Sequence, residues 1–145
     1  MKIALIHITT KIFPTENMKI LIADDHDVVR STIAGMLRSM EGVYVVAEAR
    51  NGADAVSEAR RTAPDLVLLD VHMPGVNGYE AARQIKSSLP TARVAIMSVA
   101  NSSSHEREAA RMSADMFIEK GSLRSGIRNL LAKMQMNAEP VTVAA

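Results

Sequence analysis

Residues 66–70 read Leu-Val-Leu-Leu-Asp, four apolar residues followed at once by a carboxylate. Three other apolar runs also lead directly into polar residues: Lys19-Ile-Leu-Ile-Ala23 before Asp24 and Asp25, Val94-Ala-Ile-Met97 before Ser98, and Met116-Phe-Ile-Glu119 before Lys120. Short runs that do not alternate with polar residues are typical of parallel strands covered by helices on both faces. The runs therefore predict neighbouring strands of one parallel sheet, with polar residues at their carboxyl ends.

Helical segments separate these runs, and Val43 to Ala47 supplies one more strand. The first helical segment carries Val29, Ile33 and Leu37 on one face, and Asp27 is placed to cap it. This alternation predicts an α/β fold, a flavodoxin-like, doubly wound, five-stranded parallel sheet of order 2-1-3-4-5 with helices on both faces. In that order the first and third strands are neighbours, so Asp25 is expected beside Asp70.

Length and composition limit the other possibilities. The 145 residues suit one domain, which we place at residues 18–136, with an N-terminal extension at 1–17 and a C-terminal tail at 137–145. The 17 basic and 16 acidic residues nearly balance, which predicts neither nucleic-acid nor membrane binding. In the extension, Ile3 to Ile8 has high β propensity, and pairing with another strand is the alternative reading of that segment. The segment between Ser102 and Ser113 has the thinnest apolar face, which predicts a loosely held helix.

The residues at the strand ends suggest phosphoryl chemistry. Carboxylates crowded together favour a hard divalent cation, and Mg²⁺ is typically held by one or two carboxylates, waters and phosphate oxygens. An aspartate can also act as the nucleophile that forms an acyl phosphate. Lys120 would neutralise charge on the phosphoryl group, and Ser98 could donate a hydrogen bond to it. The sequence contains no phosphate-binding glycine motif that would anchor a nucleotide.

From about residue 18 to 136 these residues resemble the receiver domains of bacterial two-component response regulators. The resemblance implies that Asp70 is the phosphoacceptor and that Ser98 and Phe117 are the switch residues. It also implies that Lys120 and Ser98 act with Asp70 in the phosphorylation reaction, Lys120 by balancing charge. It further implies a Mg²⁺ or Mn²⁺ site. Asp25 and Asp70 are direct ligands, Asp24 acts mainly through water, and the backbone carbonyl of His72 is the remaining ligand that the protein supplies.

The stretch Leu68-Leu-Asp-Val-His-Met-Pro-Gly75 is most similar to receivers of the LuxR/FixJ type, which usually carry a helix-turn-helix output domain. The resemblance implies a cytoplasmic signalling switch, not an enzyme beyond its own phosphorylation and dephosphorylation. Its expected partners are a sensor histidine kinase or phosphotransfer protein and an output protein or missing C-terminal effector domain. The fourth helix, fifth strand and fifth helix would form the contact surface, also for a homodimer. Too few residues follow Lys120 for a DNA-binding domain, so we expect a stand-alone receiver or a fragment.

Three positions depart from the common receiver pattern. Gly121 replaces a frequent proline, His72 stands where side chains influence phosphoryl lifetime, and Val99 is bulkier than the residue usual there. Two other functions stay open: a receiver-like adaptor that works without phosphorylation, and a haloacid-dehalogenase-like phosphatase using Asp70 as nucleophile. The second is disfavoured because such enzymes carry another aspartate two residues on, where this chain has His72.

Overall fold

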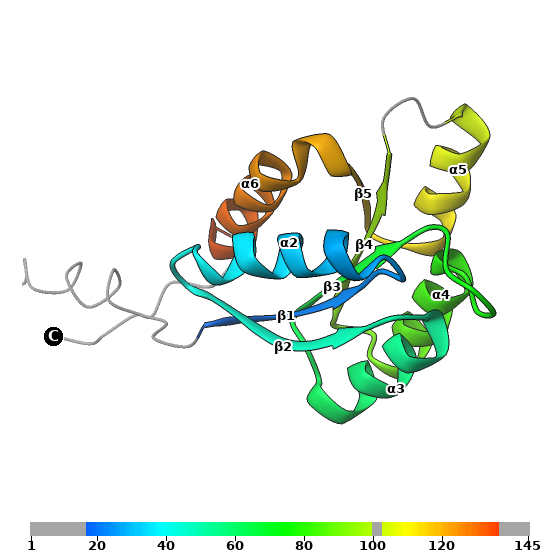
Figure 1. Ribbon diagram of the computed structural model, residues 1–145, viewed down its shortest axis with the longest axis horizontal. Helices are drawn as coiled ribbons and strands as arrows, with labels where there is room; N and C mark the ends of the chain where they lie inside the picture. The colour runs from blue at the N-terminus through cyan, green and yellow to red at the C-terminus, as the bar shows by residue number, and fades with distance from the viewer. Residues whose placement is uncertain (1–16, 100–102, 137–145) are drawn as a thin grey trace, which may run out of the picture.

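The computed structural model describes residues 17–99 and 103–136, so nearly all of the predicted extension and the whole predicted tail lie outside the described residues. The strands are β1 (Met18–Ala23), β2 (Val43–Ala49), β3 (Leu66–Asp70), β4 (Arg93–Ser98) and β5 (Met116–Glu119). They form one sheet of order β2-β1-β3-β4-β5 in which every neighbouring pair is parallel (Figure 1). The predicted sheet and strand order are confirmed.

Helices cover both faces of this sheet. They are α2 (Asp27–Arg38), α3 (Gly52–Thr62), α4 (Gly78–Ser88), α5 (Ser104–Ser113) and α6 (Leu123–Met136), the last preceded by a short 3₁₀ turn, η1 (Lys120–Ser122). In Figure 1, α2 and α6 lie on one side of the sheet, and α3 and α4 lie on the other. No helix within the described ranges is both long enough and apolar enough to cross a membrane.

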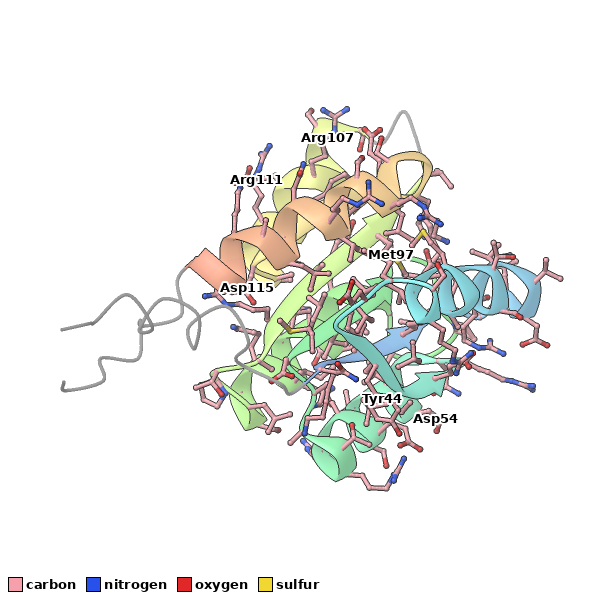
Figure 2. The ribbon with its side chains drawn as sticks, turned by 90° about the vertical axis from the view of Figure 1, so that its left-hand side faces the viewer. Tyr44, Asp54, Met97, Arg107, Arg111 and Asp115 are labelled. Atoms are coloured by element: carbon pink, nitrogen blue, oxygen red, sulfur yellow. The ribbon has the colours of Figure 1, made fainter. Side chains whose placement is uncertain are left out.

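The central strand β3 is buried on both faces, which explains why residues 66–69 are all apolar. Leu66 and Leu68 pack in the apolar cluster beneath α2 and α6, whereas Val67 and Leu69 pack in the cluster beneath α3 and α4. All of these side chains are fully buried. Figure 2 shows the interior position of Met97 on neighbouring β4, while Arg107 and Arg111 project outward from α5. Burial on both faces removes the polar alternation that a one-sided sheet would show.

The start of α2 corrects one prediction. Asp27 does not cap α2: it is the first helical residue, and His26 occupies the cap position without a side-chain capping bond. The carboxylate of Asp27 instead accepts a hydrogen bond from Arg30 Nη2 at 2.8 Å, from the side chain three residues further along the same helix. Helix α3, in contrast, begins with a capping side chain, because Asn51 accepts a hydrogen bond from the Asp54 backbone N–H.

Helix α5 is the helix for which the sequence predicts the thinnest apolar face. Among the α5 side chains that the structure describes, only Ala110 and Ser113 are buried. Two polar contacts join it to α4: Tyr79 Oη donates to the carbonyl oxygen of Glu106 at 3.2 Å, and Arg83 Nη1 donates to Ser113 Oγ at 3.1 Å. The thin apolar face is therefore present, while the loose attachment inferred from it stays a prediction.

Candidate functional site

The carboxyl ends of the strands bring the predicted polar residues to one edge of the sheet. β1 lies beside β3 with Ala23 opposite Leu69, and β3 lies beside β4 with Asp70 opposite Met97. Asp24 therefore follows β1 next to the end of β3. Asp24 is fully buried, and Asp70 and Ser98 are only 4% and 3% exposed. Buried polar groups of this kind require partners, because unpaired charges in an apolar interior are costly.

Lys120 supplies that partner for two carboxylates at once. Its Nζ donates a hydrogen bond to Asp24 Oδ2 at 2.8 Å and lies 2.9 Å from Asp70 Oδ1. The lysine reaches this position because η1 begins directly at the end of β5 and turns the side chain over the sheet edge. The structure thus joins Asp24, Asp70 and Lys120, which are up to 96 residues apart in the sequence, into one charged cluster.

The electrostatics of the cluster differ for its acid and its base. Burial raises the pKa of the Asp70 carboxyl above its ordinary value, and the neighbouring charge of Asp24 adds to the rise, although Lys120 opposes it. Burial alone would lower the pKa of Lys120, but its hydrogen bonds to Asp24 and Asp70 outweigh burial and raise that pKa. Lys120 is therefore a firmly protonated cation beside a carboxylate whose charge is costly.

Asp25 and His26 extend the cluster toward solvent. The Asp25 side chain is 32% exposed, and His26 Nδ1 lies 3.0 Å from Asp25 Oδ1 and 3.4 Å from Asp24 Oδ1. One donor atom from each of Asp24, Asp25, His26 and Asp70 falls within 4.8 Å of all the others. Three carboxylates at this spacing fit a divalent cation. His26 was not among the predicted ligands, although its place directly after the two aspartates was a usable signal.

Arg30 is a second residue that the sequence reasoning missed. Its Nη1 donates to the backbone carbonyl of Asp24 at 2.8 Å, and the residue is only 8% exposed. Asp27 and Glu48 hold the other guanidinium nitrogens. The available signal was an arginine spaced four and seven residues from Ala34 and Leu37, which share its buried helix face. Arg30 thus fixes the backbone that presents the acidic pair.

The loop after Asp70 forms one wall of a hollow beside the acidic pair. A cavity of about 520 Å³ is lined by Asp25, the loop residues and the first turns of α4 and α5. His72 is exposed to solvent and lines the same hollow as Asp25, while its backbone carbonyl as a metal ligand stays a prediction. The start of α4 passes so close that a Cβ on Gly78 would meet the carbonyl oxygen of Asp70 at 2.3 Å. Only glycine fits this position without a shift of the backbone.

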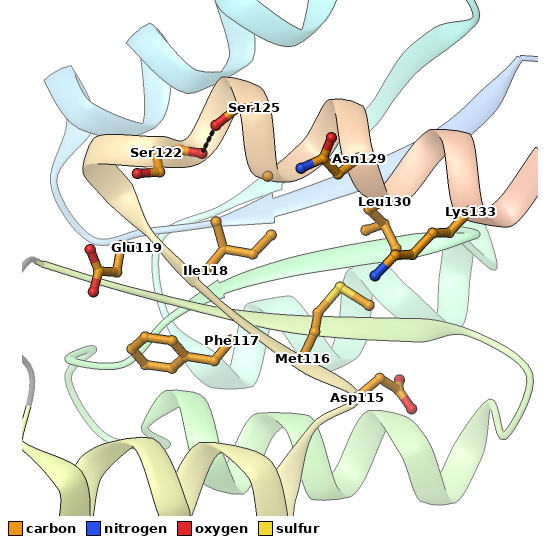
Figure 3. A pocket seen from close by; sticks show the side chains of 11 residues that line it. Asp115, Met116, Phe117, Ile118, Glu119, Ser122, Ser125, Asn129, Leu130 and Lys133 are labelled. Atoms are coloured by element: carbon orange, nitrogen blue, oxygen red, sulfur yellow. Dashed lines mark hydrogen bonds between the residues drawn. The ribbon is translucent and has the colours of Figure 1, made fainter.

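The two predicted switch residues lie on β4 and β5. Ser98 is buried at the end of β4, and Phe117 lies on β5 opposite Ile96, half-buried against the apolar cluster beneath α3 and α4. Phe117 also lines a second cavity, of about 560 Å³, between β5 and α6. Figure 3 shows this groove, with Met116 and Ile118 at its base and Asn129 and Lys133 on its helical side.

A doubly wound parallel sheet whose carboxyl edge holds a lysine bridged to two buried aspartates places this chain among the α/β folds that carry their site at that edge of the sheet. The chain matches the model for the response regulator receiver domain over residues 20–135, and it belongs to that family. The predicted resemblance to LuxR-type receivers is confirmed by a LuxR-family structure among those described next.

Response regulator GacA of Pseudomonas aeruginosa is 38% identical over 104 residues, which cover 72% of this chain and 49% of GacA. The receiver domain of the putative response regulator NarL from Mycobacterium tuberculosis superimposes with a TM-score of 0.75 and 30% identity, covering 85% of this chain and 99% of that one. A LuxR-family response regulator from Aurantimonas sp. gives a TM-score of 0.73 and 27% identity over 87% of this chain and 90% of that one. The chain spans about half the length of the curated relatives it matches.

Proposed function

We propose that this chain is a signalling switch in which Asp70 accepts a phosphoryl group from a histidine kinase or a phosphotransfer protein. The observation that carries the proposal is the lysine bridge: the Lys120 ammonium contacts the buried carboxylates of Asp24 and Asp70 together. Phosphoryl transfer depends mainly on positioning and on neutralising charge, and this cluster supplies a nucleophile, a cation and an acidic pair in one place.

In the proposed step, a carboxylate oxygen of Asp70 forms a bond to phosphorus while the N–P bond of the donor phosphohistidine breaks. The imidazole nitrogen keeps the electron pair of that bond and takes up a proton from solvent. Lys120, 2.9 Å from Asp70 Oδ1, is placed to balance charge on the phosphoryl oxygens. Burial disfavours the charged form of the Asp70 carboxylate, as its raised pKa indicates, and phosphorylation places the negative charge on phosphoryl oxygens instead of on that buried oxygen.

The carboxylates of Asp24, Asp25 and Asp70 would hold Mg²⁺ or Mn²⁺, with the backbone carbonyl of His72 as the further protein ligand we infer. Their donor atoms meet within 4.8 Å, which supports this assignment. When bound, the cation would neutralise the negative charge of an incoming phosphoryl group. Two further residues position these ligands: Arg30 holds the Asp24 backbone, and Gly78 lets the start of α4 approach the Asp70 backbone.

The output of the switch belongs to the same proposal. Ser98 would hydrogen bond to the phosphoryl group, and Phe117 would change its packing between α5 and the groove beside α6. The surface of α5, β5 and α6 would then bind an output protein, an effector domain or a second copy with altered affinity, without direct nucleic-acid contact. Differential contacts in two states are sufficient for such a change.

Incubation with Mg²⁺ and acetyl phosphate tests the phosphoacceptor. We expect intact-mass spectrometry to show one phosphoryl group added to the wild-type chain, stable in acid and labile in base, and no adduct on Asp70→Asn. Asp65→Asn is the matched control, because Asp65 directly precedes the same strand at its opposite, exposed end. It should be phosphorylated normally. An undiminished adduct on Asp70→Asn would contradict the proposal, and sustained turnover of aryl phosphates would favour the phosphatase alternative.

A further inference from the structure

His26 occupies the N-cap position of α2, but its side chain contacts Asp24 and Asp25 instead of capping the helix. Helix N-caps are normally Ser, Thr, Asp or Asn, whose side chains bond to the free backbone N–H groups of the first turn. His26 occupies this position in α2 and makes no such bond. Its side chain is 67% exposed, so close packing does not dictate where the ring points. The imidazole nevertheless turns toward the two aspartates that precede it.

The distances from His26 to the two aspartates suit a shared metal ion. Donor atoms arranged tetrahedrally on bonds of about 2.1 Å are separated by about 3.4 Å. His26 Nδ1 lies 3.4 Å from Asp24 Oδ1 and 3.0 Å from Asp25 Oδ1. The backbone N–H of His26 also donates to Asp24 Oδ1 at 2.9 Å, which fixes the turn that carries the ring. Asp70 brings the fourth donor atom within 4.8 Å of the other three.

We propose that His26 is a metal ligand that lets this site bind Zn²⁺, or a similar transition-metal ion, in competition with Mg²⁺. The proposal rests on the metal site of the proposed function and assigns it a further ligand and a second class of ion. Mg²⁺ prefers oxygen donors, whereas imidazole nitrogen suits Zn²⁺ and its neighbours in the periodic table. Asp25 would serve both ions, so binding of one excludes the other.

The opposing interpretation is that the His26 ring only donates a hydrogen bond to Asp25 and orients it. Such a role would affect Mg²⁺ and Zn²⁺ alike, because both would lose the same carboxylate geometry. A ligand role affects Zn²⁺ selectively and changes the electronic environment of the ring nitrogen. The two roles can therefore be separated by comparing the two ions and by observing the imidazole directly.

The experiment uses the full chain, with Zn²⁺ affinity measured by chelator competition and Mg²⁺ affinity by calorimetry. We expect His26→Gln to weaken Zn²⁺ binding at least about tenfold, the usual minimum when even an indirect partner of a metal is lost. Mg²⁺ affinity should stay within about twofold, since its oxygen ligands remain. Asp25→Asn should weaken both ions. His105→Gln, a histidine change on α5, controls for zinc bound elsewhere and should change neither.

NMR of the chain labelled with ¹⁵N-histidine supplies the independent measurement. Added Zn²⁺ should shift the His26 ring nitrogen strongly, and excess Mg²⁺ should reverse the shift. Zn²⁺ affinity unchanged in His26→Gln, equal losses for both ions, or no shift of that nitrogen would overturn the assignment of His26. Zinc bound through His26 by a chain that does not bind Mg²⁺ would support this inference and contradict the Mg²⁺ site of the proposed function alone.

Discussion

Asp70 is a buried carboxylate whose charge opposes folding. Burial, with Asp24 adding to it, raises its folded-state pKa above the ordinary 3.8 despite the opposing Lys120. A raised carboxyl pKa means that the folded state binds the proton more tightly than the unfolded chain does. The corresponding stabilisation is complete below the unfolded pKa and is lost as pH rises through the folded pKa. At neutral pH without metal, the carboxylate therefore lowers the free energy of unfolding.

We accordingly predict that Asp70→Asn is more stable than the wild type at neutral pH in a metal chelator. The stability difference should narrow as pH falls through the folded pKa of Asp70 toward 3.8, because the wild-type carboxyl then becomes neutral too. Urea unfolding at several pH values measures the difference, and Asp65→Asn serves as the exposed control. An amide variant that is less stable at neutral pH, or a difference independent of pH, would show that Lys120 outweighs burial.

At the scale of elements, we expect α5 to unfold locally more readily than the helices beside it. Its attachment includes the hydrogen bond from Tyr79 Oη to the Glu106 carbonyl. Burial, together with the charge of Glu106, raises the pKa of Tyr79, so the hydroxyl stays protonated and can donate. One such bond contributes about 0.5–1.5 kcal/mol net. We predict that Tyr79→Phe speeds amide hydrogen exchange in α5 by roughly two- to tenfold.

The control for this prediction is Tyr44→Phe, which removes the same hydroxyl from a side chain exposed on the edge strand β2. It should leave exchange in α5 unchanged. Faster exchange spread evenly over the whole sheet in Tyr79→Phe would indicate a loss of global stability. Unchanged exchange in α5 would mean that apolar contacts around Ala110 hold the helix without help from Tyr79.

The elements also show which features a sequence can reveal. The apolar run 66–69 and the cap Asn51 were predictable, because strand burial and helix capping depend on neighbours in the chain. The capping role of Asp27 was predicted wrongly, because Asp27 is already the first residue of the helix, and its carboxylate accepts from Arg30 instead. The bond between Tyr79 and Glu106 joins residues 27 positions apart, and local pattern carries no information about it.

At the scale of the whole molecule, the site was predictable because parallel strands place their carboxyl ends at one edge. Asp24 and Lys120 follow β1 and β5, Asp70 ends β3, and the sheet brings these three residues into contact. The place of His26 directly after the two aspartates was a usable signal, but the direction of its exposed ring was not predictable, because it depends on the exact turn after β1. Strand order determines which residues meet, while side-chain direction determines what they bind.

The two apolar clusters should unfold together, because they share one sheet. Leu68 and Leu69 are adjacent and fully buried, yet they pack on opposite faces. We predict that each change to alanine lowers the free energy of unfolding by about 2–5 kcal/mol. Since β3 belongs to both clusters, either variant should reduce the exchange protection of α2 and of α4 equally in a single transition. Protection lost only from α2 in Leu68→Ala, with α4 unaffected, would instead show that the two layers are separate cooperative units.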